Sequence, residues 1–137
     1  MARSQQRKGR AGELELVKVL NDAGVSVQPG DPVSYGKTPD IIGFPGIHCE
    51  VKRVEKLNIS LAMEQAERDA LKFHDGLPAV FHRKNRSPWL VTMKLTDWMK
   101  LYTHIFNLQG EYGQKSGHTE DAGKRRTGAD QGAYHEY

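Results

Sequence analysis

The chain has 137 residues, of which 37% are hydrophobic and 27% charged, and its formal net charge at pH 7 is +3. This length suits one domain with a single modest core. No apolar run approaches the ~20 residues of a transmembrane helix, and the polar N-terminal region has no signal-peptide core, which argues against membrane and secreted classes. We therefore expect a soluble, cytoplasmic protein.

Residues 10–24 have the periodicity of an amphipathic helix. Its apolar face carries Leu16, Val17, Leu20 and Ala23. Glycine commonly occupies the position just after a helix, so we expect Gly24 to end this one.

One acidic residue, Glu13, falls on the apolar face of this helix between Val17 and Leu20. In one interpretation it lies in the first turn, where acids favour the helix dipole and stay hydrated. In the other, it reaches into the fold and joins further carboxylates. The sequence leaves both interpretations open.

Three short strands follow in the next segment. The first spans residues 25–28 and precedes a loop rich in glycine, proline and serine. The other two, residues 40–44 and 47–53, are joined by a turn at Pro45 and Gly46. We expect these two strands to form a hairpin.

The expected hairpin gathers charged side chains on an apolar sheet. Side chains alternate along a strand, so Glu50 and Lys52 project from the same face, ~6.7 Å apart, while Val51 points into the core. Asp40 opens the neighbouring strand and would lie next to Glu50. Such a group is costly unless its members pair or hold a metal. Carboxylates, with water and a backbone carbonyl, are ligands that Mg²⁺ prefers.

The second half of the sequence predicts four more elements. A helix spans residues 58–75 with Asn58 or Ser60 as its cap, strands span 77–82 and 89–94, and a last helix follows Thr96. The order αβββαββα predicts an α/β fold with a small central mixed β-sheet flanked by helices.

The last 31 residues differ in character from the rest. They hold six of the fourteen glycines and little aliphatic surface. Such a segment cannot bury enough apolar area to offset its ordering entropy. We expect a domain over residues 1–106 and a disordered tail over residues 107–137.

Cysteine and histidine give no sign of a zinc site. Cys49, the single cysteine, is expected to pack in the core. The six histidines form no H-x-x-x-H or H-E-x-x-H pattern, so structural or surface roles are expected for them.

Four stretches resemble the PD-(D/E)xK nuclease superfamily: R-K-G-R-A-G-E at residues 7–13, P-D-I-I at 39–42, E-V-K-R at 50–53 and W-L-V-T at 89–92. Over residues 7–105 the arrangement is similar to the Holliday-junction resolvase branch, of archaeal or phage type. The resemblance implies a restriction-endonuclease-like core. It also implies that Glu13, Asp40, Glu50 and the carbonyl of Val51 bind Mg²⁺, or Mn²⁺ in its place, and that Lys52 is catalytic.

A glutamine also matches the resemblance. Gln65 corresponds to a residue that several nuclease families place beside the site, although it could equally be a polar residue on the flank of the second helix.

Two basic clusters, at residues 1–10 and 83–86, accompany the acidic site. Basic clusters near an acidic site fit a phosphate-backbone partner, while either cluster alone could simply be solubilising charge. The residues expected to contact nucleic acid are Arg7, Lys8, Arg10, Lys37, Arg53, Arg83, Lys84 and Arg86.

The function implied is that of a Mg²⁺-dependent endonuclease that hydrolyses DNA phosphodiester bonds in branched or duplex DNA. A Holliday-junction resolvase of DNA recombination and repair is its most specific form, and that form requires a homodimer. Three alternatives stay open: a nicking or flap nuclease of phage type, a catalytically silent nucleic-acid-binding module, and a structural protein with a buried ion network.

Overall fold

A computed structural model describes the backbone of residues 2–33 and 36–115 and the side chains of residues 9–33 and 36–108. The chain divides into two compact units, Met1–Leu95 and Thr96–Tyr137. Among the described residues, no helix combines the length and apolar character needed to cross a bilayer.

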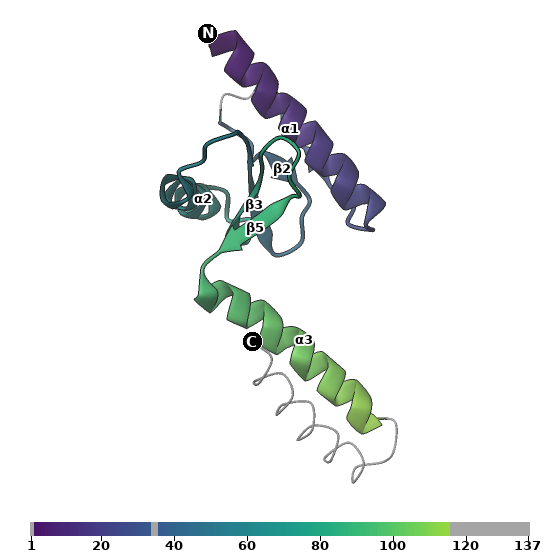
Figure 1. Cartoon of the computed structure of the whole chain (residues 1–137). Coiled ribbons are helices and arrows are strands. Elements are labelled where there is room, and N and C mark those ends of the chain that lie inside the picture. Colours follow the sequence, from purple (N-terminus) through teal and green to yellow (C-terminus); the bar gives the residue numbers. More distant parts are fainter. Residues whose placement is uncertain (1, 34–35, 116–137) are drawn as a thin grey trace. The chain divides into compact units, whose positions relative to one another are not determined.

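The elements occur in the order that the sequence predicts (Figure 1). They are α1 (Ala2–Asp22), β1 (Gln28–Pro29), β2 (Ile41–Ile42), β3 (Ile47–Arg53), α2 (Ile59–Phe73), β4 (Leu77–Arg83), β5 (Leu90–Met93) and α3 (Leu95–Lys115). The α/β fold with a small mixed sheet is therefore confirmed.

The main sheet has the strand order β3-β4-β5. β3 and β4 are parallel, with Glu50 opposite Val80, and β4 and β5 are antiparallel. Parallel neighbours need a crossover connection, and α2 supplies it between β3 and β4.

The predicted hairpin between residues 40–44 and 47–53 was wrong. Among the described residues, β2 pairs instead with β1 in a separate two-stranded antiparallel sheet. Gly43 and Gly46 adopt φ angles of 86° and 75°, which only glycine adopts readily, and they turn the chain between β2 and β3. The turn that was expected to fold the two strands together thus redirects the chain.

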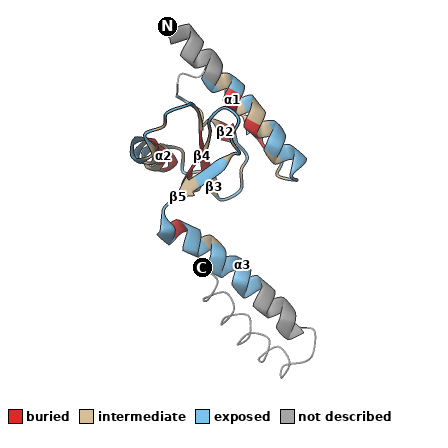
Figure 2. Ribbon diagram, viewed as in Figure 1, coloured by how far each residue is buried: buried red, intermediate tan, exposed pale blue. Residues whose placement is uncertain are grey.

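The two faces of the main sheet pack against different helices (Figure 2). On one face, Leu16 of α1 joins a buried cluster that also contains Val27, Ile41, Cys49, Val51, Ala79 and Phe81. On the other face, Ala62 and Ala66 of α2 pack against Val80. Strand alternation explains the division, because Val80 lies between two residues that face α1.

The C-terminal half of α1 packs as predicted, except at Ala23, which lies just beyond the end of the helix. Val17 and Leu20 contact the core, but Ala23 is exposed. The helix ends at Asp22 and Gly24 adopts a φ of 97°, as expected of a glycine at this position. Nearer the N-terminus of α1, a Cβ on Gly12 would lie 2.5 Å from Cβ of Arg53, so this glycine permits the close approach of α1 to β3.

The cap of α2 is also as predicted, since the Asn58 side chain accepts a hydrogen bond from the Leu61 amide at 3.2 Å. Cys49 is fully buried, which confirms its predicted packing role.

Helix α3 runs to Lys115, beyond the predicted domain end at residue 106. Residues 107–115 of the segment expected to be a tail are thus helical, and residues 116–137 lie outside the described part of the chain. Within α3, the rings of Trp98, Tyr102 and Phe106 stack in sequence, with centroids 5.2 and 6.2 Å apart. Spacing of four residues places them on one side of the helix.

Candidate functional site

The site is built on one face of β3. His48, Glu50 and Lys52 alternate with the core residues Cys49 and Val51 along this strand. They therefore share the face that α2 covers. His48 and Glu50 are only 1% and 4% exposed, so both polar groups lie inside the fold.

Helix α2 presents matching side chains to this face. Gln65, Asp69 and Phe73 recur every fourth residue, a rise of ~6 Å per step, close to the ~6.7 Å between alternate strand residues. Lys52 Nζ donates a hydrogen bond to Gln65 Oε1 at 2.9 Å. At the other end, the His48 ring stacks against Phe73, with centroids 6.2 Å apart.

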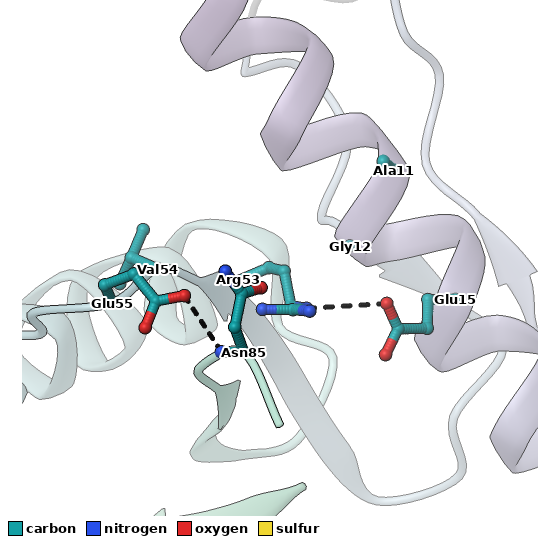
Figure 3. A pocket seen from close by; sticks show the side chains of 7 residues that line it. All are labelled: Ala11, Gly12, Glu15, Arg53, Val54, Glu55 and Asn85. Carbon is teal, nitrogen blue, oxygen red and sulfur yellow. Dashed lines mark hydrogen bonds and ion pairs between the residues drawn. The ribbon is translucent and has the colours of Figure 1, made fainter. Parts of the chain in front are cut away.

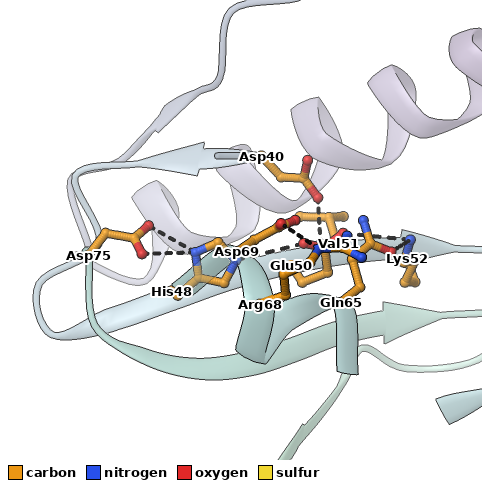
Figure 4. A network of polar contacts seen from close by, with 9 residues as sticks. All are labelled: Asp40, His48, Glu50, Val51, Lys52, Gln65, Arg68, Asp69 and Asp75. Atoms are coloured by element: carbon orange, nitrogen blue, oxygen red, sulfur yellow. Dashed lines mark hydrogen bonds and ion pairs between the residues drawn. The ribbon is translucent and has the colours of Figure 1, made fainter. Parts of the chain in front are cut away.

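The side chain of Asp40, which lies in the loop before β2, is next to β3 (Figure 4). Its Oδ2 accepts a hydrogen bond from the Val51 amide at 2.9 Å. Burial, and then repulsion from Glu50, raise the pKa of Asp40 to about 7, and Glu13 adds to the repulsion. Two carboxyl groups are thus held close enough to interact strongly although no strand ladder joins β2 to β3.

Glu13 lies near Asp40, whose side chain interacts with it. Because α1 begins at Ala2, the interpretation of Glu13 as a hydrated first-turn acid was wrong. Arg10 Nη1 contacts Glu13 Oε2 at 3.2 Å and donates to the carbonyl of Gly30 at 2.6 Å. Burial raises the pKa of Glu13, and the interactions with Arg10 and with the Asp40 side chain act to lower it.

Glu50 is at the centre of the group. Its Oε1 lies 3.5 Å from Lys52 Nζ, and its Oε2 lies 3.7 Å from His48 Nε2. The other ring nitrogen, His48 Nδ1, is 2.9 Å from both carboxylate oxygens of Asp75. Burial lowers the pKa of His48, but the contacts and charges of Glu50 and Asp75 outweigh burial and raise it.

Sequence reasoning missed three residues of this group: His48, Asp69 and Asp75. A signal for His48 was present, because it precedes Glu50 by two residues on a strand and must share its face. Asp69 follows Gln65 by four residues and shares its side of a helix. Asp75 follows the end of α2, and no periodicity indicates where it points.

Two sets of groups in this region could hold a cation. Asp40, Glu50, Glu13 and the carbonyl of Val51 supply oxygen atoms, the ligands that Mg²⁺ prefers. The mutual repulsion of the carboxylates is what a divalent cation would neutralise, so the donors fit such an ion. Within the described residues, ligand atoms of His48, Glu50 and Asp69 also lie within 4.8 Å of one another.

Three of the basic residues expected to contact nucleic acid form ion pairs with acids of the protein. Arg53 Nε lies 3.4 Å from Glu15 Oε2, and Arg83 pairs with the other oxygen of Glu15, to which Trp89 Nε1 also donates at 3.2 Å. Burial raises the pKa of Glu15, but Arg83 and Arg53 outweigh it, so the net shift is downward. Arg10 is similarly engaged with Glu13.

Three of the other predicted contacts are more accessible. Lys37, Lys84 and Arg86 are exposed, and Arg86 adopts a φ of 60° in the turn between β4 and β5. Arg7 and Lys8 lie in α1, but their side chains are outside the described part of the structure.

A pocket of about 470 Å³ lies next to the Arg53–Glu15 pair (Figure 3). It is lined by Ala11, Gly12, Glu15, Arg53, Val54, Glu55 and Asn85. The backbone N–H of Asn85 donates to Glu55 Oε1 at 3.0 Å, and this hydrogen bond connects the β4–β5 turn to the segment that follows β3. None of the lining residues belongs to the group around Glu50.

No protein-family model, curated protein or solved structure matches this chain. The class that fold and site define is a small α/β protein with a buried carboxylate group beside a lysine. The resemblance to PD-(D/E)xK nucleases stays a prediction.

Proposed function

We propose that this protein is a metal-dependent endonuclease that hydrolyses DNA phosphodiester bonds. The convergence of three carboxyl groups, from Glu13, Asp40 and Glu50, with the ammonium group of Lys52 carries the proposal. These residues come from α1, the loop before β2, and β3, so the fold brings together groups that lie far apart in the sequence.

Asp40, Glu50, Glu13 and the carbonyl of Val51 are the groups that would hold Mg²⁺, or Mn²⁺ in its place. Such an ion, when bound, neutralises charge on the attacked phosphate and lowers the pKa of a water molecule. The Val51 amide fixes the orientation of Asp40 by donating to Oδ2. Arg10 likewise fixes the orientation of Glu13 through its contact with Oε2.

Lys52 is the group best placed to act on the phosphate. Its side chain is 27% exposed, against 5% for Glu50, so it is the more accessible end of their ion pair. Gln65 accepts one of its hydrogen bonds at 2.9 Å and orients the ammonium group. Lys52 would stabilise charge that develops on the phosphate oxygens, while Gln65 positions it.

The direct test is cleavage of supercoiled plasmid in Mg²⁺ by the wild type and by Glu50→Gln and Lys52→Ala. Loss of a group that stabilises transition-state charge commonly lowers the rate ~10²–10³-fold. Matched controls are Glu64→Gln and Lys56→Ala, which change exposed residues. DNA affinity should change little in all four variants, because phosphate contacts elsewhere dominate affinity.

Each possible result has a clear meaning. Cleavage by Glu50→Gln or Lys52→Ala at the wild-type rate would refute the assignment of the site. A wild type that binds DNA without cutting it in Mg²⁺ or Mn²⁺ would identify a silent binding module. Linear duplex, flap, single-stranded and four-way-junction substrates at matched salt then separate a junction resolvase from a nicking or flap nuclease.

A further inference from the structure

We propose that His48, Glu50 and Asp69 form a second cation site, selective for a divalent transition metal such as Mn²⁺, with Glu50 shared between this site and the carboxylate group around Asp40. The inference does not depend on nuclease activity, since it concerns metal binding by the free protein.

The first observation is the buried nitrogen of His48. Nε2 belongs to a side chain that is 1% exposed, and among the residues that the structure describes it has no hydrogen-bond partner. The nearest acidic atom, Glu50 Oε2, lies 3.7 Å away, too far for a hydrogen bond. Buried polar atoms are almost always satisfied, so this nitrogen, aimed at a carboxylate, supports a cation as the partner that the two groups share.

The second observation is the spacing of the ligand atoms. One atom from each of His48, Glu50 and Asp69 lies within 4.8 Å of the others. Donors on opposite sides of an ion at ~2.1 Å are ~4.2 Å apart, and neighbouring donors are closer. Side-chain shifts of less than an ångström would therefore bring all three donors within ligand distance of one ion.

The third observation is the partner of the other ring nitrogen. Asp75 binds His48 Nδ1 through both of its oxygens at 2.9 Å. A histidine that ligates a metal almost always donates its second ring N–H to a carboxylate or a carbonyl group, which fixes the tautomer and orients the ring. Stacking against Phe73 restrains the same ring from one side. The support expected of a metal-binding histidine is thus in place.

The donor set also indicates which ions would bind. One imidazole nitrogen and two carboxylates suit Mn²⁺, Fe²⁺, Co²⁺ and Zn²⁺, whereas Mg²⁺ prefers oxygen ligands alone. Asp69 lies on α2 with 21% of its side chain exposed, and its contact with Arg68 at 3.3 Å involves an arginine that is 71% exposed. Arg68 can therefore move into solvent when Asp69 binds an ion.

The test uses Mn²⁺ and the full chain after removal of metals with EDTA. Calorimetry measures affinity, and pulsed electron paramagnetic resonance detects the magnetic coupling between Mn²⁺ and a directly bound nitrogen. The wild type should show this nitrogen coupling. Asp69→Asn should weaken binding at the nitrogen-coupled site at least ~10-fold, as expected for loss of a metal-site contact. Glu64→Gln, on the exposed side of the same helix, should match the wild type.

His48→Gln should abolish the nitrogen coupling while oxygen-only binding remains. If this buried substitution prevents folding, Asp69→Asn still decides the question, because it changes a partly exposed side chain. Absence of nitrogen coupling in the wild type would overturn the proposal and leave His48 as a bridge between Asp75 and Glu50. Unchanged affinity and coupling in Asp69→Asn would overturn it as well.

Discussion

Replacement of Asp40 by Asn should stabilise the metal-free protein at alkaline pH. The folded protein raises the pKa of Asp40 from its ordinary value of 3.8 to about 7. An acid with a raised folded pKa holds its proton more tightly in the folded state, so the wild-type free energy of unfolding falls as pH rises from ~4 to ~7. Asn keeps an oxygen that can accept from the Val51 amide and removes the charge.

The expected size follows from the two pKa values. At ~1.4 kcal/mol per pH unit, the ionised form costs the folded state up to about 4 kcal/mol above pH 8 and less than ~1 kcal/mol at pH 4. Urea unfolding of wild type and Asp40→Asn in EDTA, at pH 4, 6 and 8.5, should therefore show a gap that widens with pH. Asp22→Asn, in an exposed ion pair, is the control and should shift stability by no more than ~1 kcal/mol at each pH.

Magnesium gives a second readout of the same reasoning. At pH 8.5, Mg²⁺ at ~100 times its dissociation constant should stabilise the wild type by ~2.7 kcal/mol. It should stabilise Asp40→Asn much less, since one ligand charge is missing. Stability profiles for wild type and Asp40→Asn that run parallel from pH 4 to 8.5 would refute the argument that burial and repulsion from Glu50 raise the pKa of Asp40 in the folded protein.

Three further outcomes are expected. Gly12→Ala should destabilise the protein by ~1–3 kcal/mol in urea unfolding, because its Cβ would lie 2.5 Å from that of Arg53; an unchanged midpoint would show that α1 does not pack this closely. Leu16→Ala should cost ~2–5 kcal/mol, since Leu16 is 1% exposed in the core; a cost below ~1 kcal/mol would contradict its burial. Sedimentation at micromolar concentration should show a homodimer if the protein resolves four-way junctions, and a strict monomer, also on DNA, would favour a nicking or flap nuclease.

The parts of the fold that the sequence predicted best are those with a clear period. The bounds of β3, residues 47–53, were predicted correctly because apolar and charged residues alternate there. The pairing of β2 was not predicted, because the partner strand β1 is only two residues long and includes a proline. Short strands of this kind carry too few residues for a pattern, and tertiary contacts determine what they pair with.

The site shows the same limit. Glu50 and Lys52 lie on one strand, so alternation alone placed them together. The position of Glu13 could not be decided from the sequence, because it depended on where α1 begins, and the helix extends to Ala2 through residues without apolar periodicity. The position of Asp69 near His48 and Glu50 depends on the register of α2 against β3, to which the packing of Ala62 and Ala66 against Val80 contributes.

The repeat of α2 is slightly shorter than the repeat of β3, and this difference limits how many polar side chains can be paired along the two elements. Each step of four helix residues advances ~6 Å, while each step of two strand residues advances ~6.7 Å. The two rows therefore drift apart by ~0.7 Å per step and would be ~2 Å out of phase at a fourth pair. Polar chemistry between this helix and this strand is accordingly confined to a short central stretch, and a longer α2 could not widen it.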